Sequence, residues 1–126
     1  GQLVKIMNNM VLFQTVSALA EALAIGQRAG MDGELLFGAL SKGSADSFAL
    51  RNHGLKALLP MDFPTDAFPA TYARKDLDYA LELAGQVGLD AAGAELVRGR
   101  LDRAIDAGFG ENYFPVLLRI VEAAQS

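Results

Sequence analysis

The chain has 126 residues, 52% of them hydrophobic and 21% charged, so it is long and apolar enough to bury a core and is not a disordered segment. Its formal net charge is −4 and its Lys and Arg residues are scattered, which argues against a groove that follows nucleic-acid phosphates. The absence of cysteine excludes disulfides and thiolate metal sites and fits a reducing compartment, so we expect a cytoplasmic location.

The first predicted element is one long helix over residues 2–29, which contain no proline, and Gly30 is suited to end it. Apolar residues fall on nearly every side of this helix, which predicts packing by neighbours in several directions. Polar side chains, Lys5 and Glu21 among them, interrupt the apolar run, and no signal-peptide cleavage site follows it. We therefore expect a buried helix of a soluble protein and no membrane span.

Shorter helices are predicted along the rest of the chain. Asp32 is a suitable N-cap for a helix through Leu40, and Asn112 for the last one. The segment 60–69 carries three prolines and is typical of an extended loop. The other helices are predicted over residues 47–59, 72–87 and 90–107, with glycines at 88 and 108 as terminators. No stretch alternates between apolar and polar residues, so the fold class is all-α, with about six helices and no internal repeat.

A polar patch interrupts the apolar surface at the start of the long helix. At 100° per residue, Gln2, Asn8 and Asn9 all lie within about 60° of Lys5. The same stripe continues into apolar residues further along the helix, so we expect Lys5 to be partly desolvated, with the Asn9 amide oxygen near its ammonium. Such a lysine can donate or accept a proton. The alternative is that the stripe simply faces solvent near the terminus.

A second candidate site follows the Pro-rich loop, in the stretch FPATYARKDLDYA, residues 68–80. Arg74 and Lys75 lie on the first turns of the predicted helix, where cations oppose the helix dipole unless an anion approaches. This pattern favours a negatively charged ligand. A solvated helical turn is the alternative explanation.

Other chemistries find little support in the sequence. His53 is the single histidine, and no acidic cluster has metal-ligand spacing, so no metal site is predicted. The segment GFGENY, residues 108–113, lacks the third glycine and the preceding strand of a dinucleotide-binding loop. Tyr79, Tyr113 and the seven phenylalanines are predicted to belong to the core.

Together the two stretches resemble the C-terminal helical domain of the β-hydroxyacid dehydrogenase family, which includes 3-hydroxyisobutyrate dehydrogenase, tartronate semialdehyde reductase and glyoxylate/succinic semialdehyde reductases. The family's G-x-x-x-K-x-x-x-N motif is matched by Gly1, Lys5 and Asn9. Its Lys-Asp-Leu motif, with an apolar residue eight positions before the Asp, is matched by Phe68, Lys75, Asp76 and Leu77. With the A-G-x-G element at 107–110, the resemblance extends over essentially the whole chain.

The resemblance implies a fold like the C-terminal domain of 6-phosphogluconate dehydrogenase and a specific set of roles. Lys5 would be the catalytic acid/base for hydride exchange between a small hydroxy acid or semialdehyde and NAD or NADP. Lys75 would contact the cofactor. The implied substrate-binding residues are Asn8, Asn9, Phe68 and Asp76. Residues 1–126 would form the helical substrate and dimerisation domain of a homodimer.

The same resemblance implies an N-terminal Rossmann domain, which this chain does not contain, so the fragment alone is expected to be inactive. Hydride transfer needs the reacting atoms held roughly 3–3.5 Å apart, and one wall of a site does not achieve that. Two other functions stay open from the sequence. One is a non-catalytic helical dimerisation or interaction module that retains the family fold. The other is a protein that binds carboxylates without turnover.

Overall fold

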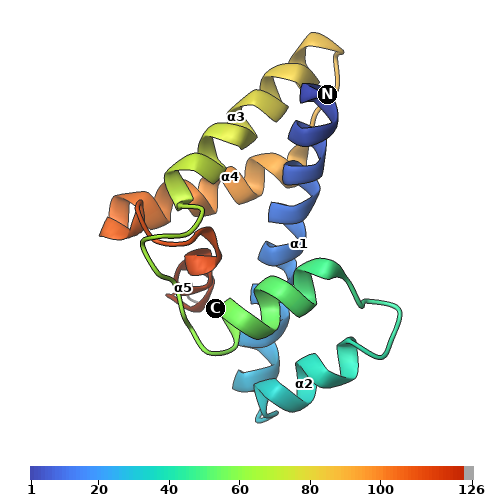
Figure 1. Cartoon of the computed structure of the whole chain (residues 1–126), viewed down its shortest axis with the longest axis vertical. Helices are drawn as coiled ribbons and strands as arrows, with labels where there is room; N and C mark the ends of the chain where they lie inside the picture. Colours follow the sequence, from blue (N-terminus) through green and yellow to red (C-terminus); the bar gives the residue numbers. More distant parts are fainter. Residues whose placement is uncertain (124–126) are drawn as a thin grey trace.

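The structure is a computed structural model that describes residues 1–123, and this part of the chain is helical with no strand (Figure 1). The α-helices are α1 (Gln2–Arg28), α2 (Gly33–Leu40), α3 (Ala70–Gln86), α4 (Ala92–Ala104) and α5 (Leu117–Ala123). Between them lie two π-helical segments, η1 (Leu50–Leu58) and η2 (Ile105–Phe109), and the 3-10 turn η3 (Phe114–Val116). The predicted all-α class with one long N-terminal helix is confirmed.

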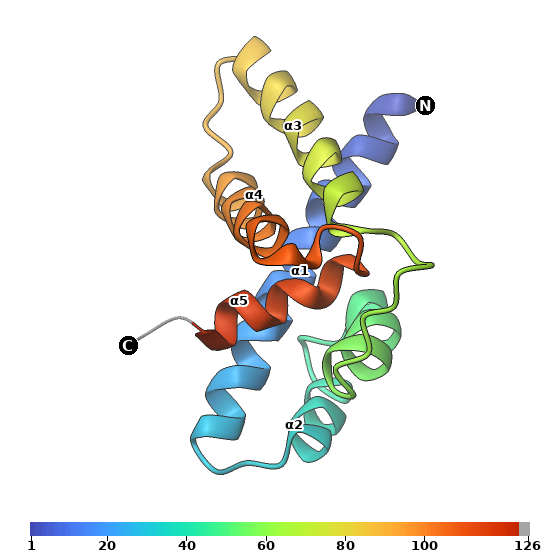
Figure 2. The same ribbon diagram turned by 90° about the vertical axis from the view of Figure 1, so that its left-hand side faces the viewer.

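The long helix α1 is the centre of the fold. Figures 1 and 2 show it running along the molecule, with the pair α3 and α4 beside its N-terminal half and α2 near its C-terminal end. It packs against α2, α3, α4, α5 and η1, as its distribution of apolar residues predicted. Length and composition alone would allow α1 to cross a membrane, but a core helix meets the same criteria. The side chains of Phe13, Val16 and Leu23 on α1 are buried within the protein.

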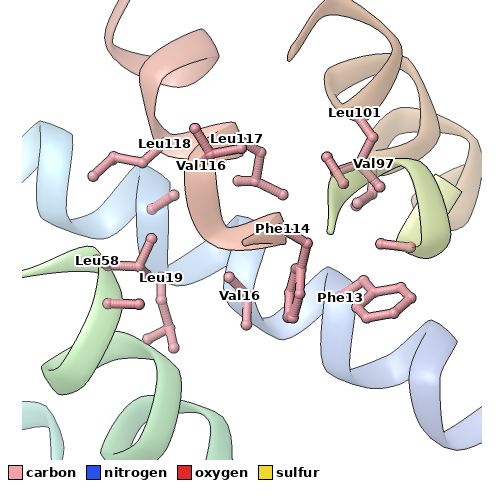
Figure 3. Packing of buried hydrophobic residues seen from close by; sticks show 14 of the residues in the cluster. Phe13, Val16, Leu19, Leu58, Val97, Leu101, Phe114, Val116, Leu117 and Leu118 are labelled. Carbon is pink, nitrogen blue, oxygen red and sulfur yellow. The ribbon is translucent and has the colours of Figure 1, made fainter. Parts of the chain in front are cut away.

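The core joins α1 to the C-terminal half of the chain (Figure 3). Phe13, Val16 and Leu19 of α1 face residues of α4 and of the segment from η3 into α5. The fully buried residues contributed by that second group include Leu101, Phe114, Val116, Leu117 and Leu118. Burial of aliphatic and aromatic side chains contributes about 1.5–3 kcal/mol each, so this cluster holds α1 and α4 in a fixed arrangement.

Several local predictions are confirmed. Gly30 and Gly88 have φ of +92° and +72°, the left-handed conformation that glycine adopts most readily after a helix. The Asp32 side chain accepts a hydrogen bond of 3.2 Å from the backbone N–H of Leu35 and so caps α2. Segment 60–69 is non-helical, and its end is held by an isolated bridge between Pro69 and Tyr113.

Two further local predictions have different outcomes. Asn112 does not cap the last helix, because its Nδ2 donates a 2.7 Å hydrogen bond to the Phe63 carbonyl and its own carbonyl accepts from the N–H of Ala70 at 2.9 Å. These bonds fasten the start of α3 to the turn before η3. The helix predicted at 47–59 is present, since the chain is helical from residue 48 to the end of η1 and Ser47 Oγ accepts a 3.0 Å hydrogen bond from the N–H of Leu50. Within η1, Gly54 lies so close to Phe37 that a Cβ would stand 3.2 Å from the ring.

His53 belongs to an aromatic cluster. Within residues 1–123 no group of three or more His, Cys, Asp or Glu side chains is placed to hold a metal ion. The His53 ring lies 5.5 Å from that of Phe114 and 5.8 Å from that of Tyr113, measured between centroids. The Tyr113 hydroxyl is hydrogen-bonded to Nδ1 of His53. Burial lowers the pKa of His53 and raises the pKa of Tyr113, since both charged forms lose hydration.

The stability of the protein should therefore depend on His53 in mildly acidic solution. Because folding lowers the His53 pKa below 6.5, the unfolded state takes up the proton more readily. The free energy of unfolding should fall as the pH is lowered through 6.5, and His53→Asn should reduce that fall, since Asn does not titrate. Urea unfolding of both proteins on either side of this pH measures the difference. An equal pH dependence in the two proteins would contradict the assignment.

Candidate functional site

A cavity of about 490 Å³ lies between the first turns of α1 and the middle of α3. Its walls are formed by Gln2, Lys5, Ile6, Asn9, Asp76 and Tyr79. The four residues of α1 share one face because Lys5 and Ile6 each lie three or four positions from both Gln2 and Asn9, and the two residues of α3 are three positions apart. Figure 1 shows these parts of α1 and α3 side by side, and the two helices are in contact. The fold thus brings the two stretches selected from the sequence into one cavity.

A hydrogen bond between Asn9 and Asp76 joins the two walls. Nδ2 of Asn9 donates to Oδ2 of Asp76 over 2.8 Å, and both side chains are half-buried. Nδ2 of Asn8 in turn donates to Oδ1 of Asn9 over 3.3 Å. The sequence predicted that the Asn9 amide would hold Lys5, but the structure pairs this amide with Asp76 and Asn8 instead.

Lys5 lines the cavity without an internal partner. The residue is exposed, and its ammonium forms no hydrogen bond or ion pair with any residue of the described chain, 1–123. The desolvation expected from its apolar stripe is therefore not present in this chain. An unpaired cation beside the Asn9–Asp76 pair is available to an oxygen atom of a ligand in the cavity.

The other candidate residues lie around this cavity rather than in its wall. The ring of Phe68 stacks on that of Phe13 at 6.0 Å, and Phe13 comes one turn after Asn9 on α1. Asn8 also faces a second cavity of about 440 Å³, between α1 and the segment that includes Phe48. Phe68 and Phe48 are 38% and 64% exposed, so the prediction that every Phe is core is wrong for these two residues.

The two cations at the start of α3 have different surroundings. Arg74 forms ion pairs with Asp78 and Asp102, and the hydrogen bond to Asp102 raises the Arg74 pKa. Lys75 is exposed and has no side-chain partner within residues 1–123. Ion pairs within the chain therefore account for the positive charge of Arg74, whereas no acid of residues 1–123 pairs with Lys75. The Lys75 ammonium is therefore available to an anionic ligand.

Tyr79 was missed as a site residue because aromatic residues in a helix usually pack inside. It is 45% exposed and lines the cavity, so its assignment to the core is wrong. The available signal was its spacing of three residues from Asp76, which places both side chains on one face of α3.

Comparisons with known proteins identify the family of the chain. A family model described as NAD-binding of NADP-dependent 3-hydroxyisobutyrate dehydrogenase matches residues 1–121. The chain is 36% identical over 88 residues to 2-(hydroxymethyl)glutarate dehydrogenase of Eubacterium barkeri, covering 70% of this chain and 29% of that protein. It is 26% identical over 128 residues to chloroplastic glyoxylate/succinic semialdehyde reductase 2 of Arabidopsis thaliana, covering 100% of this chain and 35% of that protein.

Two solved structures share the fold. The 3-hydroxyisobutyrate dehydrogenase of Salmonella typhimurium has a TM-score of 0.85 at 20% identity, covering 94% of this chain and 41% of that one. The 3-hydroxyisobutyrate dehydrogenase of Mycobacterium tuberculosis, in a structure with L-serine, also has a TM-score of 0.85, at 21% identity, covering 98% and 44%. The chain spans about a third of the length of the curated relatives it matches. It belongs to the 3-hydroxyisobutyrate dehydrogenase family of oxidoreductases, whose family model matches nearly the whole chain.

Proposed function

We propose that this chain is the C-terminal helical domain of an NAD(P)-dependent 3-hydroxyacid dehydrogenase or semialdehyde reductase, and that it supplies the proton-transfer lysine, Lys5. The observation that carries the proposal is the cavity in which an unpaired ammonium lies beside the Asn9–Asp76 pair. The relatives are more than twice as long as the chain, which supports an N-terminal Rossmann domain as the other part of the site. The names of these relatives support the class of reaction.

The proposed chemistry of Lys5 is proton transfer at the substrate oxygen. When bound, the nicotinamide cofactor exchanges a hydride with the carbon that carries this oxygen. In the direction of reduction, the ammonium of Lys5 gives a proton to the oxygen and becomes a neutral amine, and in the direction of oxidation the neutral amine takes the proton from the hydroxyl group. The ammonium also stabilises negative charge that develops on the oxygen, an effect that becomes large once a second domain excludes water.

The remaining residues are proposed to bind substrate and cofactor from this side of the cleft. Asn9 is one turn from Lys5, and its amide oxygen can accept a hydrogen bond from a hydroxyl group of the substrate. Nδ2 of Asn8 donates a hydrogen bond to that amide oxygen. The ring of Phe68 stacks on that of Phe13, which follows Asn9 by one helical turn. Lys75 is proposed to contact a phosphate of the cofactor as a point charge.

We also propose that the protein is a homodimer. Val4, Val11 and Ile25 are 70%, 58% and 69% exposed and follow α1 at multiples of seven residues, so they form one apolar stripe. Exposed apolar stripes of this length are typical of surfaces that a second protein covers. A second copy of the chain is the partner that the family resemblance implies.

The proposal predicts inactivity of the chain alone and activity of the protein that carries both domains. The two-domain protein should reduce NAD or NADP with a small 3-hydroxy acid, and light scattering should give the mass of two copies. The isolated 126-residue chain should show no turnover under the same conditions, because it supplies one wall of the site. Turnover by the isolated chain would contradict the domain assignment. Failure of the two-domain protein with every 3-hydroxy acid and semialdehyde would favour the non-catalytic module or binding protein.

A further inference from the structure

We propose that Asp76 is a positioning residue, which acts by fixing the orientation of the Asn9 amide and not by contacting the substrate. The inference rests on the proposed function for its effect on turnover. Its structural part stands on the 2.8 Å hydrogen bond between Nδ2 of Asn9 and Oδ2 of Asp76. It changes the role that the family resemblance implies for Asp76, which is substrate binding.

A carboxylate selects one of the two orientations of the Asn9 amide. Asp76 is an acceptor only, so the amide must present its NH₂ group to it. A rotation by 180° would place the Asn9 oxygen against the carboxylate oxygen, where two acceptors repel each other. Asn8 reinforces the choice, because its NH₂ group donates to the Asn9 oxygen on the other side. Both hydrogen bonds therefore require the same orientation of the Asn9 amide.

The selected orientation keeps the acceptor oxygen of Asn9 turned away from α3. Lys5 lies one helical turn before Asn9 and lines the same cavity. The oxygen has two lone pairs and uses one for the 3.3 Å bond from Asn8, so the other can accept from the Lys5 ammonium or from a substrate hydroxyl. The opposite orientation would turn an NH₂ group towards the ammonium, and neither donor could be satisfied by the other.

Charge argues against direct contact between Asp76 and a hydroxy-acid substrate. Such a substrate carries a carboxylate, which an ionised Asp76 repels, whereas the Lys5 ammonium in the same cavity attracts it. One oxygen of Asp76 is already used by Asn9. The arrangement is thus suited to holding a neighbouring amide and to keeping the acidic end of the substrate on the side of Lys5.

A double-mutant cycle in the two-domain protein separates positioning from direct contact. Asp76→Ala should lower kcat/KM by about tenfold to a hundredfold when Asn9 is present, the range of coupling found between residues in contact. In an Asn9→Ala background the same change should alter kcat/KM by less than about threefold, because the group it positions has gone. An equal loss in both backgrounds would overturn the proposal. Glu82→Ala is the matched control, since Glu82 is an exposed acid on α3 with no side-chain partner in residues 1–123.

The orientation itself can be tested without any turnover. In the 126-residue chain labelled with ¹⁵N, the side-chain NH₂ resonances of Asn9 should shift on Asp76→Ala and stay in place on Glu82→Ala. Unmoved Asn9 resonances in the Asp76→Ala protein would overturn the inference even if the enzyme is active. If the two-domain protein has no dehydrogenase activity, the proposed function fails, and this measurement still decides whether Asp76 orients Asn9.

Discussion

Lys5→Ala should lower kcat of the two-domain enzyme by about 10²–10⁴-fold, the usual contribution of a positioned general acid or base. The loss is expected in both directions, because the same Nζ gives the proton in reduction and takes it in oxidation. Lys5→Arg should not restore activity, since a guanidinium stays protonated and can neither give a proton in reduction nor take one in oxidation. Steady-state kinetics with saturating cofactor measure the effect. Unchanged turnover would contradict the role of Lys5.

The folded state should tolerate this substitution. The Lys5 side chain is exposed and has no partner within residues 1–123, so Lys5→Ala should change the free energy of unfolding by no more than about 0.5 kcal/mol. Lys42→Ala is the matched control for kinetics, because Lys42 is an exposed lysine in the turn that follows α2.

Lys75→Ala provides a contrast: it should raise the KM for the dinucleotide and leave kcat within a few-fold. A change in kcat alone at Lys75 would argue against a cofactor contact.

Phe114→Ala should be the most destabilising single change, at about 3–5 kcal/mol. The ring of Phe114 is 1% exposed and lies 4.7 Å from that of Phe13 and 6.3 Å from that of Phe68, between centroids. Truncation leaves a cavity where η3 meets α1, and it removes the edge-to-face contact with Phe13. Because domains have only about 5–15 kcal/mol of stability, a large part of the total would be lost. Urea unfolding followed by circular dichroism measures the change.

Phe48→Ala is the matched control for this measurement. Phe48 is 64% exposed, so the same loss of atoms leaves no internal cavity and should cost less than about 1 kcal/mol. A similar cost for both variants would show that the cluster around Phe114 is not the core of the domain. Since Phe13 follows Asn9 by one helical turn, Phe114→Ala should also loosen the wall of the cavity that α1 contributes.

The sequence alone determined the features that depend on local physics. The extent of α1, the turns at Gly30 and Gly88 and the cap at Asp32 follow from helix propensity, left-handed glycine and side-chain capping, which act within a few residues. Helical spacing also put Lys5 and Asn9 on one face. The family motifs then indicated that this face and the start of α3 belong to the same site, and the comparisons confirm the family.

The tertiary structure decided which side chains meet. Asn9 and Asp76 are 67 positions apart, and whether their side chains bond depends on the rotation and separation of α1 and α3, which the core sets. The same packing placed Tyr79 in the cavity wall and paired Arg74 of α3 with Asp102 of α4. It also brought the Asn112 side chain to the Phe63 carbonyl instead of to the start of the last helix. Local propensity contains no information on these contacts, because each is formed only after distant elements have packed.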